Sequence, residues 1–170
     1  DKNVNVITII KTLHQIIGNN IIENAGHYKT IENYLINRDG EEINFTLPSL
    51  VSAQMAELKQ KYEHEWQSLT VFERATRLHM AIVNIHPFRD GNGRVARLIM
   101  NYELIKYNYP PININENQKL SYYSMIREIN INTDCQNTPL EIGDIKTFNE
   151  TIQQLSIITF KDMQKYYKNH

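Results

Sequence analysis

Twelve consecutive residues carry the side chains whose types and spacing could do chemistry in this chain. Residues 86–97, the signature run, read His-Pro-Phe-Arg-Asp-Gly-Asn-Gly-Arg-Val-Ala-Arg. His86 titrates near neutral pH and could take a proton from an attacking hydroxyl. Asp90 is a hard oxygen ligand that could hold Mg²⁺ or Mn²⁺ on phosphates, because such ions need few protein carboxylates. The run therefore predicts a phosphate-transfer site.

The second half of the run predicts a seat for the phosphates themselves. Gly91-Asn92-Gly93 stands where a loop meets the start of a helix, and the N–H groups there form a natural anion site. Arg94 and Arg97 are three residues apart, so they share one helix face and could reach the same polyanion. Two arginines beside such a seat indicate more than one phosphate.

Two helices must position these groups. Apolar residues recur every three to four positions from Thr70 to Ile85, and Thr70 with Glu73 forms a capping box at the helix start. Pro87 prevents simple continuation of this helix, so His86 should stand at its C-terminal end. A second helix is expected to begin near Arg94 and to end before residues 110–111, which are both proline.

Each part of the run also has an ordinary structural interpretation. A histidine at a helix end often caps or packs, Asp-Gly is a common turn dipeptide, and two arginines often form a solvated helix face. It is the order and spacing of His86, Asp90, Arg94 and Arg97 that favour a site.

The run His-Pro-Phe-x-Asp-Gly-Asn-Gly-Arg-x-x-Arg resembles the signature of Fic-domain proteins at every fixed position. The resemblance implies a protein adenylyltransferase that moves AMP from ATP to a Ser, Thr or Tyr hydroxyl of a target protein, or of itself, and releases pyrophosphate. It makes His86 the general base, Asp90 the metal ligand and residues 91–93 the anion hole. Arg94 and Arg97 would contact the outer phosphates, and Phe88 would point into the core.

The resemblance extends over roughly residues 1–135. Gly26-His-Tyr-Lys29-Thr is similar to a Gly-x-Tyr-Arg-Thr segment that leads the family into a β-hairpin flap, with lysine here in place of arginine. We expect the strands of this flap at residues 30–36 and 43–47, around a turn at 38–40. In the family the flap holds the target by strand addition, which makes four residues candidates for target docking: Asn33, Tyr34, Leu35 and Ile36. The alternative is an ordinary surface hairpin.

Downstream, Tyr122, Tyr123 and Asn130 stand where the family places residues around the adenine and ribose, although tyrosine pairs on helices commonly belong to a core. The fold class is mainly α, a helical bundle with the flap as its one hairpin. Further helices are expected over residues 9–17, from Pro48 to Trp66, over 122–130 and over 148–163. We interpret residues 1–170 as one Fic domain, with a core to about 135, a helical extension at 136–170 and flanking regions missing.

Composition excludes several classes of function. A net charge of −1 over 170 residues gives no electrostatic reason to bind nucleic acid or an anionic membrane. The single cysteine, Cys135, fits a reducing compartment, and we expect the cytoplasm, or a host cell reached as part of a larger secreted effector. A P-loop would need Lys-Ser/Thr after Gly93, and a zinc hydrolase would need a second histidine after His64-Glu65.

The sequence leaves open how the activity is regulated and which molecule donates the transferred group. Many Fic proteins carry a Ser/Thr-x-x-x-Glu-Gly/Asn helix whose glutamate pairs with the second signature arginine, and the nearest match here, Ser124 to Ile129, has the wrong last residue. Three explanations are open: the inhibitory helix is cut off upstream, an antitoxin-like partner supplies it, or this chain is unrestrained. A homo-oligomer is the other candidate assembly. Alternative activities are transfer from another nucleotide or phosphodiester donor, removal of AMP, and nucleotide binding without catalysis.

Overall fold

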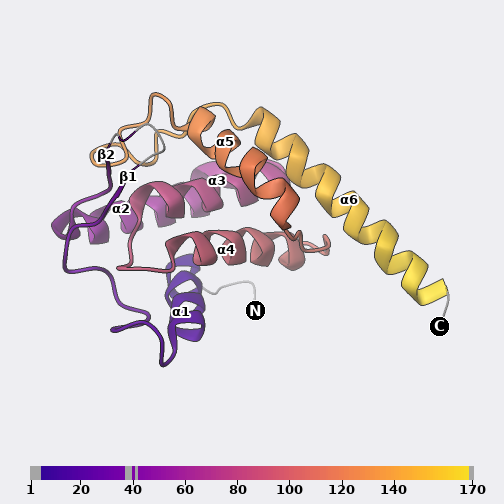
Figure 1. The fold of residues 1–170 in the computed structure, drawn as a ribbon, viewed down its shortest axis with the longest axis horizontal. Helices are drawn as coiled ribbons and strands as arrows, with labels where there is room; N and C mark the ends of the chain where they lie inside the picture. The colour runs from indigo at the N-terminus through magenta and orange to yellow at the C-terminus, as the bar shows by residue number, and fades with distance from the viewer. Residues whose placement is uncertain (1–4, 37–39, 41, 169–170) are drawn as a thin grey trace.

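The computed structural model describes residues 5–36, 40 and 42–168, and it is mainly helical with one small hairpin (Figure 1). The elements in chain order are α1 (Val6–Gly18), β1 (Tyr34–Ile36), β2 (Glu42–Asn44), α2 (Pro48–Gln60), α3 (Val71–Ile85), α4 (Asn92–Lys106), α5 (Lys119–Ile129) and α6 (Lys146–Lys168). Short π and 3-10 turns follow α2, at Lys61–Glu65 and Trp66–Ser68, and a 3-10 turn, Glu116–Gln118, precedes α5. None of the described helices is long and apolar enough to span a membrane.

The pair α3 and α4 forms the centre of the molecule. Ten of the fifteen residues of α3 are buried, so this helix is covered on most of its circumference. Its start is fixed by the predicted capping box, because Thr70 accepts from the Glu73 N–H and Glu73 accepts from the Thr70 N–H. The two central helices are joined by residues 86–91, the signature loop, and therefore present that loop at one end of the bundle.

Two apolar clusters lie on either side of this pair. One joins α1 and α2 to α3 and α4 through residues such as Ile10, Leu58 and Phe88. The other joins α5 and α6 to the same helices through residues such as Met100 and Phe148. Figure 1 shows α1 on one side of α4 and α5 with α6 on the other. Helix α1 covers the expected residues 9–17 and begins earlier, at Val6, and Ile16 near its C-terminal end is 67% exposed.

The flap is shorter than the sequence predicted. Its strands pair antiparallel with Leu35 opposite Ile43, and β1 begins at Tyr34 instead of Thr30. The second strand ends at Asn44 because Phe45 and Thr46 turn inward and are buried, the Thr46 hydroxyl donating to the Cys135 carbonyl at 3.2 Å. Residues 38 and 39 of the expected turn lie outside the described residues.

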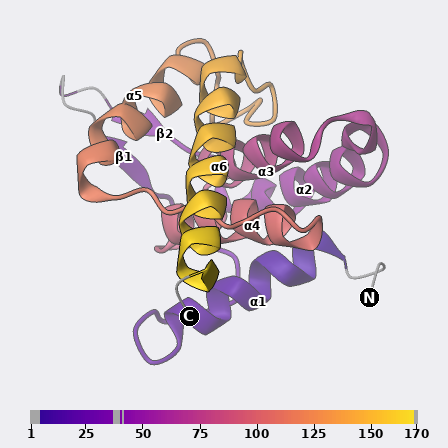
Figure 2. The same ribbon diagram turned by 90° about the vertical axis from the view of Figure 1, so that its right-hand side faces the viewer.

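Two other predicted helices differ from the structure. The α-helix from Pro48 ends at Gln60, and the chain reaches Trp66 through the π and 3-10 turns, where the Gln67 amide donates to the Tyr62 carbonyl at 2.6 Å. Helix α6 packs on the bundle only in its first half. Beyond residue 156 it extends away from the other helices (Figure 1), and Met163 in this part is 44% exposed. In Figure 2 the same helix passes in front of α4.

Candidate active site

His86 is the C-cap of α3, directly after Ile85, and it adopts a left-handed conformation, with φ of 52° and ψ of 57°. Its ring stacks on Phe45 at 3.9 Å between centroids, and its Nδ1 lies 3.1 Å from the Val83 carbonyl oxygen. Because a carbonyl can only accept, Nδ1 carries the proton and Nε2 is left as a proton acceptor. Burial lowers the pKa of His86 to about 4, with a further lowering by the Lys29 charge. The ring is therefore neutral near pH 7.

The signature loop is closed on itself by Asn92. The Phe88 N–H donates to the Asn92 Oδ1 at 2.9 Å, and the Asn92 Nδ2 donates to the Phe88 carbonyl at 2.8 Å. Phe88 is fully buried, which confirms the prediction that it points into the core. The Asn92 side chain thus shapes the loop, and what it can offer an anion is its backbone N–H at the start of α4.

His14 of α1 supports the loop from outside and was not predicted. Its ring lies parallel to Phe88 at 3.8 Å, its Nε2 donates to the Asp90 carbonyl at 3.0 Å, and its Nδ1 accepts from the Gly26 N–H at 2.8 Å. Burial is the main cause that lowers the pKa of His14. The sequence signal for this role was weak: one histidine within the apolar period of α1.

The helix whose N-terminus forms the anion seat begins earlier than predicted. Gly91 is the N-cap of α4 with φ of 79°, so the helix starts at Asn92, two residues before Arg94. The left-handed conformation of Gly91 turns the chain sharply enough for the helix to begin at the next residue. Gly93 is exposed, and the side-chain atom nearest to a Cβ built there is Arg97 Nη1, at 3.7 Å. The exposed N-terminus and the guanidinium of Arg97 therefore face the same space.

The charged groups of the site gather around this N-terminus. The Asp90 side chain is 74% exposed, its Oδ1 accepting from the Gly91 N–H at 2.6 Å and its Oδ2 lying 3.4 Å from Arg94 Nη2. Arg94 is 42% exposed, and Arg97 is half-buried beside it. Among the described residues, no three His, Cys, Asp or Glu side chains gather into a metal-binding group.

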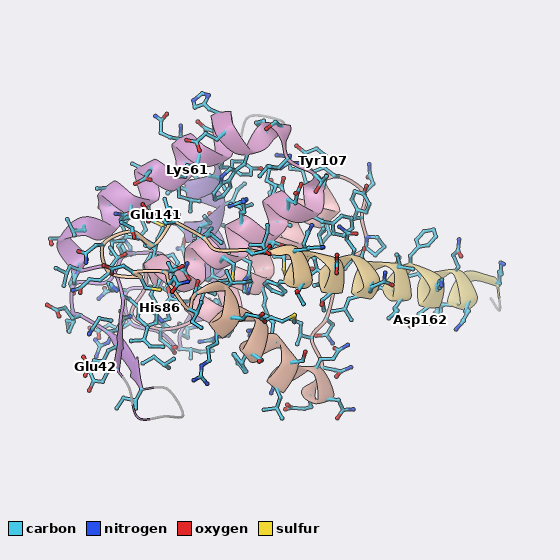
Figure 3. The ribbon with its side chains drawn as sticks, turned by 90° about the horizontal axis from the view of Figure 1, so that it is seen from above. Glu42, Lys61, His86, Tyr107, Glu141 and Asp162 are labelled. Carbon is cyan, nitrogen blue, oxygen red and sulfur yellow. The ribbon has the colours of Figure 1, made fainter. Side chains whose placement is uncertain are left out.

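The base of the flap is tied to the signature loop by Lys29 and Asn33. The Lys29 N–H donates to the Pro87 carbonyl at 2.9 Å, and the Asn33 Nδ2 donates to the Phe88 carbonyl at 3.0 Å. The Asn33 side chain, predicted to dock a target, is thus turned toward the protein. Tyr34, Leu35 and Ile36 are each more than half exposed, as target contacts would require. His86 lies at the end of the molecule that carries the flap, near Glu42 in Figure 3, opposite Asp162.

The three predicted adenosine contacts differ in their surroundings. Tyr122 is 4% exposed and its hydroxyl lies 2.7 Å from His79 Nε2, so it packs in the core, and its place near the adenine and ribose stays a prediction. Tyr123 is 57% exposed. The Asn130 Nδ2 donates to Asn84 at 2.6 Å, while its Oδ1 is buried and unpaired among the described residues. The contacts that Asn84 and His79 of α3 make with Asn130 and Tyr122 were not predicted, because in the sequence both residues are ordinary positions of a buried helix.

Together these groups place a proton acceptor, an exposed carboxylate, a helix N-terminus and two guanidiniums around one loop. His86 could take the proton of an attacking hydroxyl, and the two arginines could stabilise the negative charge on a leaving phosphate. The arrangement therefore suits a displacement at phosphorus. The structure brings the side chains that the sequence singled out to one loop, and it adds the residues that hold this loop: His14, Lys29 and Asn92.

Comparison with known proteins gives a consistent result. A model described as Fic/DOC family matches residues 6–104. The protein adenylyltransferase Fic of Drosophila mojavensis is 34% identical over 110 residues, which are 62% of this chain and 22% of that protein. That of Drosophila grimshawi is 40% identical over 81 residues, which are 45% of this chain and 17% of that protein. The chain thus spans about a fifth of the length of these curated relatives.

Solved structures share the fold. A Fic domain containing signaling protein from Bacteroides thetaiotaomicron superposes with a TM-score of 0.75 at 28% identity, over 92% of this chain and 66% of that one. Fic-1 from C. elegans gives a TM-score of 0.75 at 23% identity, over 96% of this chain and 44% of that one. The helical bundle with its flap is therefore a fold that these proteins share.

Proposed function

Because the chain belongs to the Fic/DOC family, we propose that it transfers AMP from ATP to a Ser, Thr or Tyr hydroxyl of a target protein. The observation that carries this proposal is the state of His86. Its Nδ1 is committed to the Val83 carbonyl, and its burial keeps the ring neutral, so Nε2 is available to take a proton at pH 7. The curated relatives named protein adenylyltransferase support the same activity.

The step would proceed by in-line displacement at the α-phosphorus. The target hydroxyl oxygen forms a bond to the α-phosphorus, and its proton passes to Nε2 of His86. The bond from the α-phosphorus to the oxygen bridging to the β-phosphorus breaks, and pyrophosphate leaves with the electron pair. The N–H groups at the start of α4 and the Arg94 and Arg97 guanidiniums would stabilise the negative charge on the phosphates.

Asp90 is the residue we propose to hold Mg²⁺ or Mn²⁺. Its carboxylate is 74% exposed and stands at the edge of the anion seat, which fits an ion shared between one protein carboxylate and the phosphates. Because the described residues form no three-ligand metal group, phosphate and water oxygens would complete the coordination. The bound ion would neutralise phosphate charge, and Arg94, now 3.4 Å from Asp90, would turn to the nucleotide.

The flap is the proposed docking site for the target segment. Tyr34, Leu35 and Ile36 expose their side chains, and β1 belongs to a sheet of two strands, so one of its edges is open among the described residues. An extended target segment could add a strand to that edge. Strand addition depends on main-chain hydrogen bonds, so it requires an extended target segment and not a particular target sequence. Around the adenosine we retain Tyr123, which is exposed, and Asn130, whose Oδ1 is unpaired among the described residues.

Restraint of the site would have to come from elsewhere. Ser124 and Glu128, the nearest match to the inhibitory motif, are both exposed on α5. We therefore propose that Arg97 is available to ATP unless another segment of the protein, an antitoxin-like protein or a second copy supplies a glutamate.

The proposal is tested with ATP labelled separately at the α- and γ-phosphates, Mg²⁺ and a cell lysate. We expect α-label on protein, with a mass gain of one AMP, and loss of this signal in His86→Ala. A matched control is His64→Ala, because His64 is exposed and far along the sequence from the signature run. γ-Label on protein would make the chain a kinase. Bound ATP without transfer, with label arriving from another nucleotide, would change the donor and contradict the proposal.

A further inference from the structure

Lys29 is an unusual lysine because its side chain lies in the protein interior. It is 5% exposed, and its ammonium group donates to the Asn33 Oδ1 at 2.5 Å. Burial lowers the pKa of Lys29 to about 8, against a raising effect of the Glu32 carboxylate. A lysine is costly to bury, so its position beside the signature loop calls for an explanation.

Lys29 and Asn33 together bind two consecutive carbonyls of the signature loop. Lys29 binds Pro87 through its backbone N–H, and Asn33 binds Phe88 through its side-chain amide. Pro87 directly follows His86, and Asn33 directly precedes β1. Two hydrogen bonds thus join the root of the flap to the peptide units that come directly after the proposed base, and a third, from the Lys29 ammonium to Asn33, links the two residues that donate them.

This arrangement fixes how the flap sits relative to His86. A shift of one residue in a strand pairing turns every side chain to the opposite face. A flap that binds its target by strand addition therefore needs a fixed position of its edge strand relative to His86. The ammonium of Lys29 also holds the Asn33 amide in one orientation, because it can donate only to Oδ1 and leaves Nδ2 to donate to Phe88.

We propose that Lys29 and Asn33 are positioning residues that set the register between the flap and His86, and so decide which hydroxyl of a docked strand is modified. This inference rests on the proposed function of the flap. Neither residue touches the reacting atoms; both act through the Pro87 and Phe88 carbonyls.

The test compares Asn33→Ala and Lys29→Met with the intact chain. Lys29→Arg is the conservative variant, since it keeps a cation and a donor. Asn113→Ala is the matched control, because Asn113 is exposed and lies in the segment after α4. The proteins of a lysate and the chain itself serve as acceptors, and tandem mass spectrometry maps the modified residues. Calorimetry measures ATP affinity in each variant.

We expect Asn33→Ala and Lys29→Met to spread modification from single hydroxyls to neighbouring ones and to lower the transfer rate about tenfold. ATP affinity should change less than twofold, and Lys29→Arg should restore the pattern. A residue with a purely structural role would lower yield without changing which hydroxyl is modified. An unchanged pattern in both variants overturns the inference alone. No transfer by the intact chain, with ATP bound, overturns the proposed function and this inference with it.

Discussion

The hydroxyl oxygen of Tyr122 lies 2.7 Å from Nε2 of His79, in the apolar region where α3, α5 and α6 meet. The two rings meet edge to face at 5.6 Å, and Phe148 closes the cluster at 5.2 Å from His79. Burial raises the pKa of Tyr122 and the Arg97 guanidinium acts in the opposite direction, so the charge of Arg97 lies close to the tyrosine hydroxyl. Since a guanidinium has donors only, the tyrosine oxygen would accept in any hydrogen bond between them. Tyr122 of α5 thus lies near one of the two arginines of the anion seat.

Tyr122→Phe should therefore weaken binding of ATP and leave binding of AMP unchanged. Losing one hydrogen bond to a charged group costs about 1.5 kcal/mol, or roughly tenfold in affinity, when Arg97 is no longer oriented toward the outer phosphates. Calorimetric titration with each nucleotide measures both effects. Tyr109→Phe is the matched control, because Tyr109 is 41% exposed and lies in the segment after α4, and it should bind ATP normally. An equal loss for ATP and AMP would mean that Tyr122 contacts the adenosine instead.

Acid should destabilise the fold through its buried histidines. Burial lowers the pKa of His79 to about 3 and that of His86 to about 4, while both are near 6.5 in an unfolded chain. Between these values the unfolded chain binds more protons, so stability is complete above pH 6.5 and falls as the pH drops toward 4. His79 alone should account for about 3 kcal/mol over that interval.

Thermal unfolding of the intact chain and of His79→Gln, followed from pH 7.5 to 4, measures this dependence. The variant cannot titrate at this position, so its stability should fall less steeply with decreasing pH. His64→Gln, at an exposed position, should keep the slope of the intact chain. Equal slopes for all three proteins would show that His79 is not buried as a neutral ring.

The two glycines of the anion seat should respond in opposite ways to substitution by alanine. At Gly91, φ is 79° and a Cβ would meet Ile22 Cδ1 at 3.2 Å and His14 Cδ2 at 3.5 Å. Left-handed strain alone should lower the free energy of unfolding by about 1–2 kcal/mol. At Gly93 the nearest atom is Arg97 Nη1 at 3.7 Å, and alanine in a helix adds about 0.5 kcal/mol of stability.

Gly93→Ala should nevertheless bind ATP more weakly, because its methyl group occupies the side of the helix N-terminus that faces Arg97. Urea unfolding and ATP titration of both variants measure the two properties separately. A Gly93→Ala protein that binds ATP like the intact chain would show that the phosphates do not approach this residue.

The opposite end of α4 offers a stability change that should spare the site. Glu103 is fully buried, pairs with Arg74, and accepts from the Tyr62 hydroxyl at 2.8 Å. Glu103→Gln leaves the buried Arg74 without its counter-charge, and we expect a loss of about 3 kcal/mol measured in urea. ATP affinity at low temperature should be unchanged. Glu116→Gln, in an exposed pair with Lys119, should cost at most about 0.5 kcal/mol.

Local patterns in the sequence predicted much of this molecule. The start of α3 follows from a capping box of four residues, and the composition of the site follows from twelve consecutive residues, because both depend on neighbours along the chain. The supports of the loop depend on distant pairs instead. His14 meets Asp90 across 76 positions and Asn33 meets Phe88 across 55, and no periodicity encodes such contacts. Distant contacts also explain why the strands of the flap are short. Asn33 and Phe45, which flank the strands, contact Phe88 and His86 and so do not extend the pairing.

The stacking of His14 on Phe88 bears on whether the site could be moved to another protein. Copying residues 86–97 between two helices of another protein would transfer Asn92, whose side chain closes the loop by hydrogen bonds to Phe88. It would not transfer His14 of α1 or the Asn33 amide, which hold the loop from outside. The smallest transplantable unit is therefore the run together with α1 and the root of the flap. Grafts that contain the run with α1, with the root of the flap or with both could be compared by their ATP affinity. This comparison would show how much each of the two segments contributes to the site.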